Sequence, residues 1–152
     1  MTMIYLTASD VQPATLDGPA RSVHATILPW NMVANTSAGP TRFVRGSVEI
    51  TSADRVAWLV EHDRNRVVGH ATSFLDTPAA LLGSFTAPDN WDQELQAAQM
   101  RTGWSVGVDV LVASADRDGT LVVSKALLRE VSSCSVPAWD SARTITQTKE
   151  TL

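Results

Sequence analysis

Short hydrophobic runs recur along the chain, separated by Gly, Pro, Asn and Ser. Alternation of apolar and polar residues is typical of a strand with one buried face, whereas a short continuous apolar run suits a strand covered on both faces. Residues 43–50 alternate in this way, and the dipeptide Asp118-Gly119 favours a tight hairpin turn between two Val-rich runs. The pattern predicts strands at residues 23–30, 43–50, 67–74, 79–85, 104–113, 120–125 and 127–136 and leaves 56–61 undecided.

One segment, at about residues 87–101, shows a helical pattern instead. Pro88 suits the first turn of a helix. Trp91, Leu95 and Ala98 recur at helical spacing, so they would form one buried stripe. We therefore expect an α+β fold that is mostly β, with a small antiparallel barrel-like sheet and one main helix packed on it.

The composition of the 152-residue chain indicates one ordinary domain. It is 44% hydrophobic and 18% charged, which is too apolar for a disordered protein and too polar for a membrane protein. No apolar run approaches the roughly 20 residues of a membrane-spanning helix, and the first residues lack the basic start of a secretory signal. We expect a cytosolic protein without a membrane partner, with an N-terminal arm (1–20), a domain (21–140) and a polar C-terminal tail (141–152).

Charge and cysteine content exclude several kinds of site. The net charge is −4 and lysine occurs only at Lys125 and Lys149, so no basic footprint for a nucleic acid is present. The single Cys134 excludes an internal disulfide and a multi-cysteine metal site. His24 and His70 lie within strand-like runs and are expected to be structural. With no metal-ligand spacing and no glycine-rich phosphate loop, we expect no metal and no cofactor.

Three residues are candidates for chemistry, and each has an ordinary alternative. His62 stands between an apolar run and a polar turn, where a sheet presents residues to a cleft, but a packed or surface histidine would look the same. Ser105 is flanked by glycines that permit close backbone approach and amide donors for an oxyanion, but a turn serine is common. Glu130 interrupts a strand-like run, where it would either orient a histidine or pair with an arginine such as Arg129.

The candidates lie in motifs that follow one another in a recognisable order. Residues 58–63 are an apolar run ending in His-Asp, and Gly69 follows after a turn. Ser-Val-Gly comes next at 105–107, then Leu-Arg-Glu-Val-Ser at 128–132 and Pro-Ala at 137–138. In this order the motifs resemble the tailed-phage prohead proteases, the head maturation serine proteases, and the resemblance covers most of the chain.

The resemblance implies a small β-barrel-like core with helices, similar to the herpesvirus assemblin fold. Ser105 would be the nucleophile, His62 its general base, and Glu130 the residue that orients His62, with Asp63 as the rival for that third role. Backbone amides would stabilise the oxyanion, and no cofactor would be needed. The substrate would be the scaffold segment of capsid protein, cleaved inside the assembling prohead in the host cytoplasm. The partners would be capsid or scaffold protein and further copies of the chain.

Two other functions stay open. Trp104 stands where the family has a smaller residue, and the chain carries little beyond the catalytic core. Both departures favour a structural or decoration protein of the capsid that keeps the fold with cleavage lost or unused. A β-rich binding module with chance motif matches is the third hypothesis, and it requires His62 and Ser105 to lie far apart. We rank the active protease first because the catalytic set is complete and in order.

Overall fold

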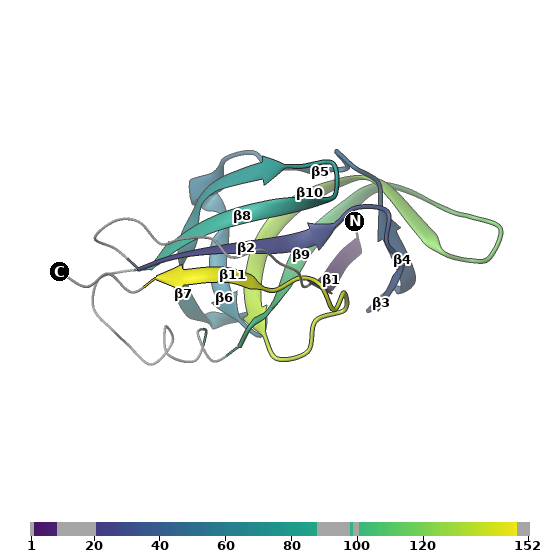
Figure 1. Ribbon diagram of the computed structural model, residues 1–152. Coiled ribbons are helices and arrows are strands. Elements are labelled where there is room, and N and C mark those ends of the chain that lie inside the picture. Colours follow the sequence, from purple (N-terminus) through teal and green to yellow (C-terminus); the bar gives the residue numbers. More distant parts are fainter. Residues whose placement is uncertain (1, 9–20, 88–97, 99–100, 149–152) are drawn as a thin grey trace.

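The computed structural model describes residues 2–8, 21–87, 98 and 101–148, which are nearly all β-structure (Figure 1). They form one eleven-stranded sheet and a single 3₁₀ turn, η1 (Ala53–Arg55). Val favours the pleated strand, and it recurs in two of the longest elements. The strands are β1 (Thr2–Ala8), β2 (Arg21–Pro29), β3 (Ala34–Thr36), β4 (Gly39–Phe43), β5 (Val48–Glu49), β6 (Ala57–Val60), β7 (Asp63–Asp76), β8 (Ala80–Ala87), β9 (Gly103–Ala115), β10 (Leu121–Cys134) and β11 (Thr144–Thr148).

Strand β10 pairs with four other strands of the sheet. One edge of β10 pairs antiparallel with β9, while its other edge takes β4, β5 and β6 in succession, all parallel. The main path runs β1-β9-β10-β6-β7-β8-β2-β11. The expectation of an antiparallel sheet is therefore wrong at β10, because three short strands separated by turns reach the same side of one long strand.

The two ends of this path approach each other at residues 142–144. The Trp104 N–H donates to the Ala142 carbonyl (3.2 Å), and the Thr26 N–H donates to the Arg143 carbonyl (3.3 Å). This segment thus links β9 to β2, and the sheet curls into a half-barrel (Figure 1). The expected arm and tail each contribute a strand to the sheet, β1 and β11.

The expected α+β class with a main helix at about residues 87–101 is wrong: the described residues are nearly all β and hold no main helix. Ala87, where the helix was expected to begin, is the last residue of β8, and both it and Thr86 pair with β2. Phe85 and Ala87 face the core in strand alternation, so the sheet pairing outweighs the Pro88 signal at this boundary. Residues 88–97 and 99–100 of the expected helix lie outside the described residues. No helix in the described part of the chain is long and apolar enough to cross a membrane.

The strand expected at residues 43–50 is broken in the middle. Phe43 ends β4, and β5 begins only at Val48. Between them the Ser47 N–H donates to the Val44 carbonyl (3.1 Å), and Gly46 has a φ of 79°, which a glycine adopts without strain. The alternating pattern is therefore that of two strands separated by a turn.

Aromatic side chains fill the inside of the curl. The Trp104 ring stacks on Phe85 with centroids 4.8 Å apart and on Trp58 with centroids 5.6 Å apart. Its Nε1–H donates to Thr144 Oγ1 (2.8 Å), so the one polar atom of this buried ring has a partner. Neighbouring residues on a strand face opposite sides of a sheet, so the burial of Trp104 inside sends Ser105 to the other face.

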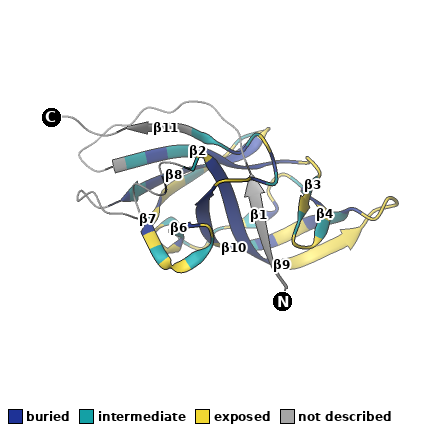
Figure 2. Cartoon of the chain, turned by 90° about the horizontal axis from the view of Figure 1, so that it is seen from below, coloured by how far each residue is buried: buried dark blue, intermediate teal, exposed yellow. Residues whose placement is uncertain are grey.

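Burial divides the β9–β10 hairpin into two halves (Figure 2). Residues 103–109 of β9 are buried, whereas 111–115 are exposed and project away from the body. On β10, residues 130–134 are buried opposite the inner half of β9. All the candidate chemistry on this hairpin lies in its buried half.

Candidate active site

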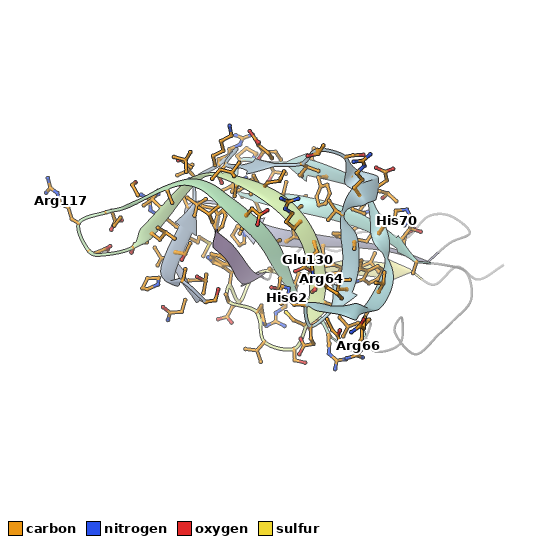
Figure 3. All side chains as sticks on the ribbon, turned by 180° about the vertical axis from the view of Figure 1, so that it is seen from behind. His62, Arg64, Arg66, His70, Arg117 and Glu130 are labelled. Carbon is orange, nitrogen blue, oxygen red and sulfur yellow. The ribbon has the colours of Figure 1, made fainter. Side chains whose placement is uncertain are left out.

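Ser105, His62 and Glu130 come from three different elements and meet at one place. Ser105 lies on β9, Glu130 on β10, and His62 in the turn between β6 and β7. His62 Nδ1 lies 2.5 Å from Glu130 Oε1, and His62 Nε2 is hydrogen-bonded to Ser105 Oγ. Figure 3 shows His62 beside Glu130. The structure therefore brings together the three residues singled out from the sequence.

The pairing of β9 with β10 sets the serine and the carboxylate side by side. Ser105 is opposite Ser132, and Gly107, two residues on, is opposite Glu130. Residues two apart on a strand share a face, so all four lie on one face of the hairpin. A register shift between Leu128 and Glu130 adds one residue to β10 at this point, as β-bulges near functional sites commonly do.

His62 is presented by a tight two-residue turn. Val60 and Asp63 pair at the ends of β6 and β7, which leaves Glu61 and His62 as the loop. Their φ values are 50° and 60°, the left-handed conformation of both central residues of a type I′ turn. Neither is Gly or Asn, so the turn is strained and must be held by its surroundings. One such contact is the Glu61 N–H, which donates to the Ser133 carbonyl (2.9 Å).

The hydrogen bonds define where the protons lie. A carboxylate only accepts, so His62 Nδ1 must carry the proton in its bond to Glu130. In a neutral imidazole the other nitrogen is then an acceptor, so Nε2 accepts a hydrogen bond from the Ser105 hydroxyl. This tautomer is the one required of a general base that takes a proton from serine.

The site is largely withdrawn from solvent. Ser105 has no exposed surface, and the side chains of Glu130 and His62 are 7% and 21% exposed. In the sheet, Ser105 is flanked by Thr7 of β1 and Ser132 of β10. Charge–dipole interactions in such a site are stronger than in water. Any molecule that is to react with Ser105 reaches it only when part of the chain around the serine moves.

The rival of Glu130 for the third role and the alternative partner of Glu130 both have contacts of their own. Asp63, the rival for the third role, accepts a hydrogen bond from the Asn65 N–H (2.9 Å) in its own turn. Arg129 forms an ion pair with Asp109. Of the two carboxylates considered for the third role, Glu130 is the one with a described contact to His62.

The remaining two histidines and the cysteine occupy other positions of the sheet. His24 Nδ1 is 2.7 Å from Ser84 Oγ, a serine–histidine pair on β2 and β8. His70 is exposed on β7, and Cys134 is buried at the end of β10. Among the described residues, no group of three or more His, Cys, Asp or Glu is placed to hold a metal ion.

Two residues have a role at the site that the sequence analysis did not assign to them. Ser132 contacts both Glu130 and His62, and Gly107 makes room for the carboxylate of Glu130. Both stand two residues from a catalytic candidate on a predicted strand, and that i, i+2 spacing was the available signal. The signal gains meaning only once the register between β9 and β10 is known.

No family model, curated protein or solved structure matches this chain.

Proposed function

We propose that this protein is a serine endopeptidase of the head maturation type, acting on the scaffold segment of a phage capsid protein. The observation that carries the proposal is the continuous hydrogen-bonded chain from Ser105 through His62 to Glu130. Nucleophile, base and orienting acid in mutual contact are the arrangement that acyl transfer by serine requires. The substrate class follows from the motif resemblance and not from the site itself.

The chemistry runs in two halves. Ser105 Oγ attacks the scissile carbonyl carbon while His62 Nε2 takes the hydroxyl proton, and Glu130 stabilises the imidazolium that forms. The tetrahedral intermediate collapses as Nε2 returns the proton to the leaving amine, which leaves an acyl-enzyme. Water, deprotonated by the same nitrogen, then hydrolyses the ester and restores Ser105. Backbone amides supply the oxyanion donors in this proposal.

Cleavage of a capsid precursor tests this function directly. The protein is co-expressed with the precursor of the phage that encodes it, and the products are resolved by mass. We expect cleavage by the native chain and none by Ser105→Ala, with both proteins folded to the same extent by circular dichroism. Equal processing by Ser105→Ala would contradict the proposal.

Ser84→Ala is a matched control for that experiment. Ser84 also contacts a histidine, His24, but no carboxylate is hydrogen-bonded to that ring within the part of the chain that the structure describes. The protease proposal expects the Ser84 variant to retain cleavage, since a serine–histidine pair alone lacks the orienting acid.

The complete burial of Ser105 favours one second candidate, a capsid-bound structural or decoration protein with an unused site. This alternative expects many copies in mature particles and no processing by the native chain. Absence from purified particles would remove it. A binding module with chance motif matches required His62 and Ser105 to lie far apart, whereas the two are in hydrogen-bond contact.

A further inference from the structure

Ser132 contacts two of the three residues Ser105, His62 and Glu130, which we call the triad. It lies opposite Ser105 in the β9–β10 register and has no exposed surface. Its Oγ–H donates to Glu130 Oε2 (2.8 Å), and the same oxygen accepts a hydrogen bond from the His62 backbone N–H (3.0 Å). One hydroxyl therefore holds both the orienting acid and the residue that carries the base.

The first of these bonds fixes the carboxylate. Glu130 Oε1 accepts a hydrogen bond from the His62 ring N–H, and Oε2 accepts one from the Ser132 hydroxyl, so each oxygen has a donor. A buried carboxylate with one oxygen unpaired is costly, and it can rotate to find another partner. Satisfying Oε2 thus keeps Oε1 directed at the histidine.

The second bond fixes the strained turn. His62 has a φ of 60°, a left-handed conformation that is strained for a residue other than glycine. Its N–H is bonded to Ser132, while the neighbouring Glu61 is bonded through its N–H to Ser133 and through its carboxylate to the Ser135 N–H. The end of β10 therefore clamps the turn, and Ser132 is the side chain in that clamp that also contacts the triad.

We infer that Ser132 is a positioning residue that couples the orientation of Glu130 to the placement of His62, a role that deepens the proposed function and rests on it. Removing the hydroxyl frees both groups at once. A misplacement of about 1 Å in an active site costs up to about 100-fold in rate. We therefore expect Ser132→Ala to slow acylation of Ser105 by roughly 10- to 100-fold, with a folded protein.

Ser133 provides the matched control. It is the next residue on β10 and equally buried, but it faces inward, where its Oγ accepts from Trp58 Nε1 (2.8 Å). Ser133→Ala removes one buried serine hydroxyl from the same strand without touching the triad side chains. A purely structural contribution of Ser132 would make the two variants alike.

Two readouts test the inference. The first is the rate of Ser105 phosphonylation by a fluorophosphonate in Ser132→Ala, Ser132→Thr and Ser133→Ala. The second is the low-field proton NMR signal of His62 Nδ1–H, which reports the bond to Glu130 whether or not the serine reacts. We expect Ser132→Ala to lose both the rate and the sharp signal, Ser132→Thr to recover them in part, and Ser133→Ala to keep them.

The outcomes separate this inference from the proposed function. If the native protein is not labelled, the protease proposal fails, and the NMR signal alone decides the role of Ser132. Loss of the His62 signal in Ser132→Ala but not in Ser133→Ala supports the positioning role. The same signal and the same rate in both alanine variants would overturn it.

Discussion

Gly107 lies directly opposite Glu130 across the β9–β10 pair, and the carboxylate occupies the space that a side chain at position 107 would fill. A Cβ added to Gly107 would lie 2.4 Å from Glu130 Oε1, far inside van der Waals contact. The oxygen concerned is the one bonded to His62. The glycine is therefore a condition for the acid to reach the histidine.

We expect Gly107→Ala to weaken the triad as well as the fold. The added methyl group displaces Oε1 from His62, because the backbone of the paired strands cannot give way easily. Overpacking of this kind costs about 1–3 kcal/mol of unfolding free energy. Chemical denaturation measures that loss, and the phosphonylation rate of Ser105 should fall in the same protein.

A double-mutant cycle identifies the cause. In a Glu130→Ala background the carboxylate is gone, so Gly107→Ala should cost markedly less stability than in the native background. Equal costs in the two backgrounds would show that the methyl group clashes with something other than Glu130.

The identity of the orienting acid can be tested by two isosteric changes. Glu130→Gln keeps the shape but removes the charge that stabilises the imidazolium, so acylation of Ser105 should fall by roughly 10²- to 10⁴-fold. Asp63→Asn makes the same change at the rival residue, whose described bond is to Asn65, and should leave the rate within a factor of about two. Labelling reactions quenched at successive times give both rates. A larger loss of rate in Asp63→Asn than in Glu130→Gln would assign the role to Asp63.

Trp104 should contribute to stability rather than to catalysis. The ring packs on Phe85 and Trp58 on the face opposite Ser105, so it does not crowd the serine. Trp104→Phe loses buried area and the bond to Thr144, and we expect a loss of about 1–3 kcal/mol with the labelling rate of the folded protein retained. Thr144→Val, which removes only the acceptor, should account for about 1 kcal/mol of it. A faster rate in Trp104→Phe would mean that the ring does restrict the site.

The burial of Ser105 predicts a dependence on probe size. Because this serine has no exposed surface, a fluorophosphonate with a short alkyl chain should react faster than the same reactive group carrying a bulky tag. Each rate is divided by that of a serine protease with an open cleft, so that intrinsic reactivity cancels. Equal normalised rates would mean that the cover over Ser105 opens freely.

The sequence contained enough information to select the three residues of the site, because the motifs and their order along the chain can be recognised without knowledge of the fold. The Asp118-Gly119 turn also gave the β9–β10 hairpin, and Gly119 has the positive φ that such a turn needs. The contact between His62 and Ser105 was an expectation of the resemblance, since the two residues come from separate hairpins.

Features that depend on pairing between distant strands were not predictable from local pattern. The parallel approach of β4, β5 and β6 to β10 leaves no periodic signal, and the role of Ser132 appears only with the register of β10 against β9. The helix expected at about residues 87–101 shows the opposite error. Pro88 indicated a helix that begins at about Ala87. Ala87 and the preceding Thr86 instead pair with β2, so strand pairing prevails over the local signal.

The central claim is that Ser105 is an activated nucleophile. The most direct test is an intact-mass measurement of the purified protein after incubation with a fluorophosphonate, with Ser105→Ala and His62→Ala alongside. We expect one phosphonyl adduct on the native chain and none on either folded variant. A folded native chain that stays unlabelled, or an adduct that persists in Ser105→Ala, would contradict it.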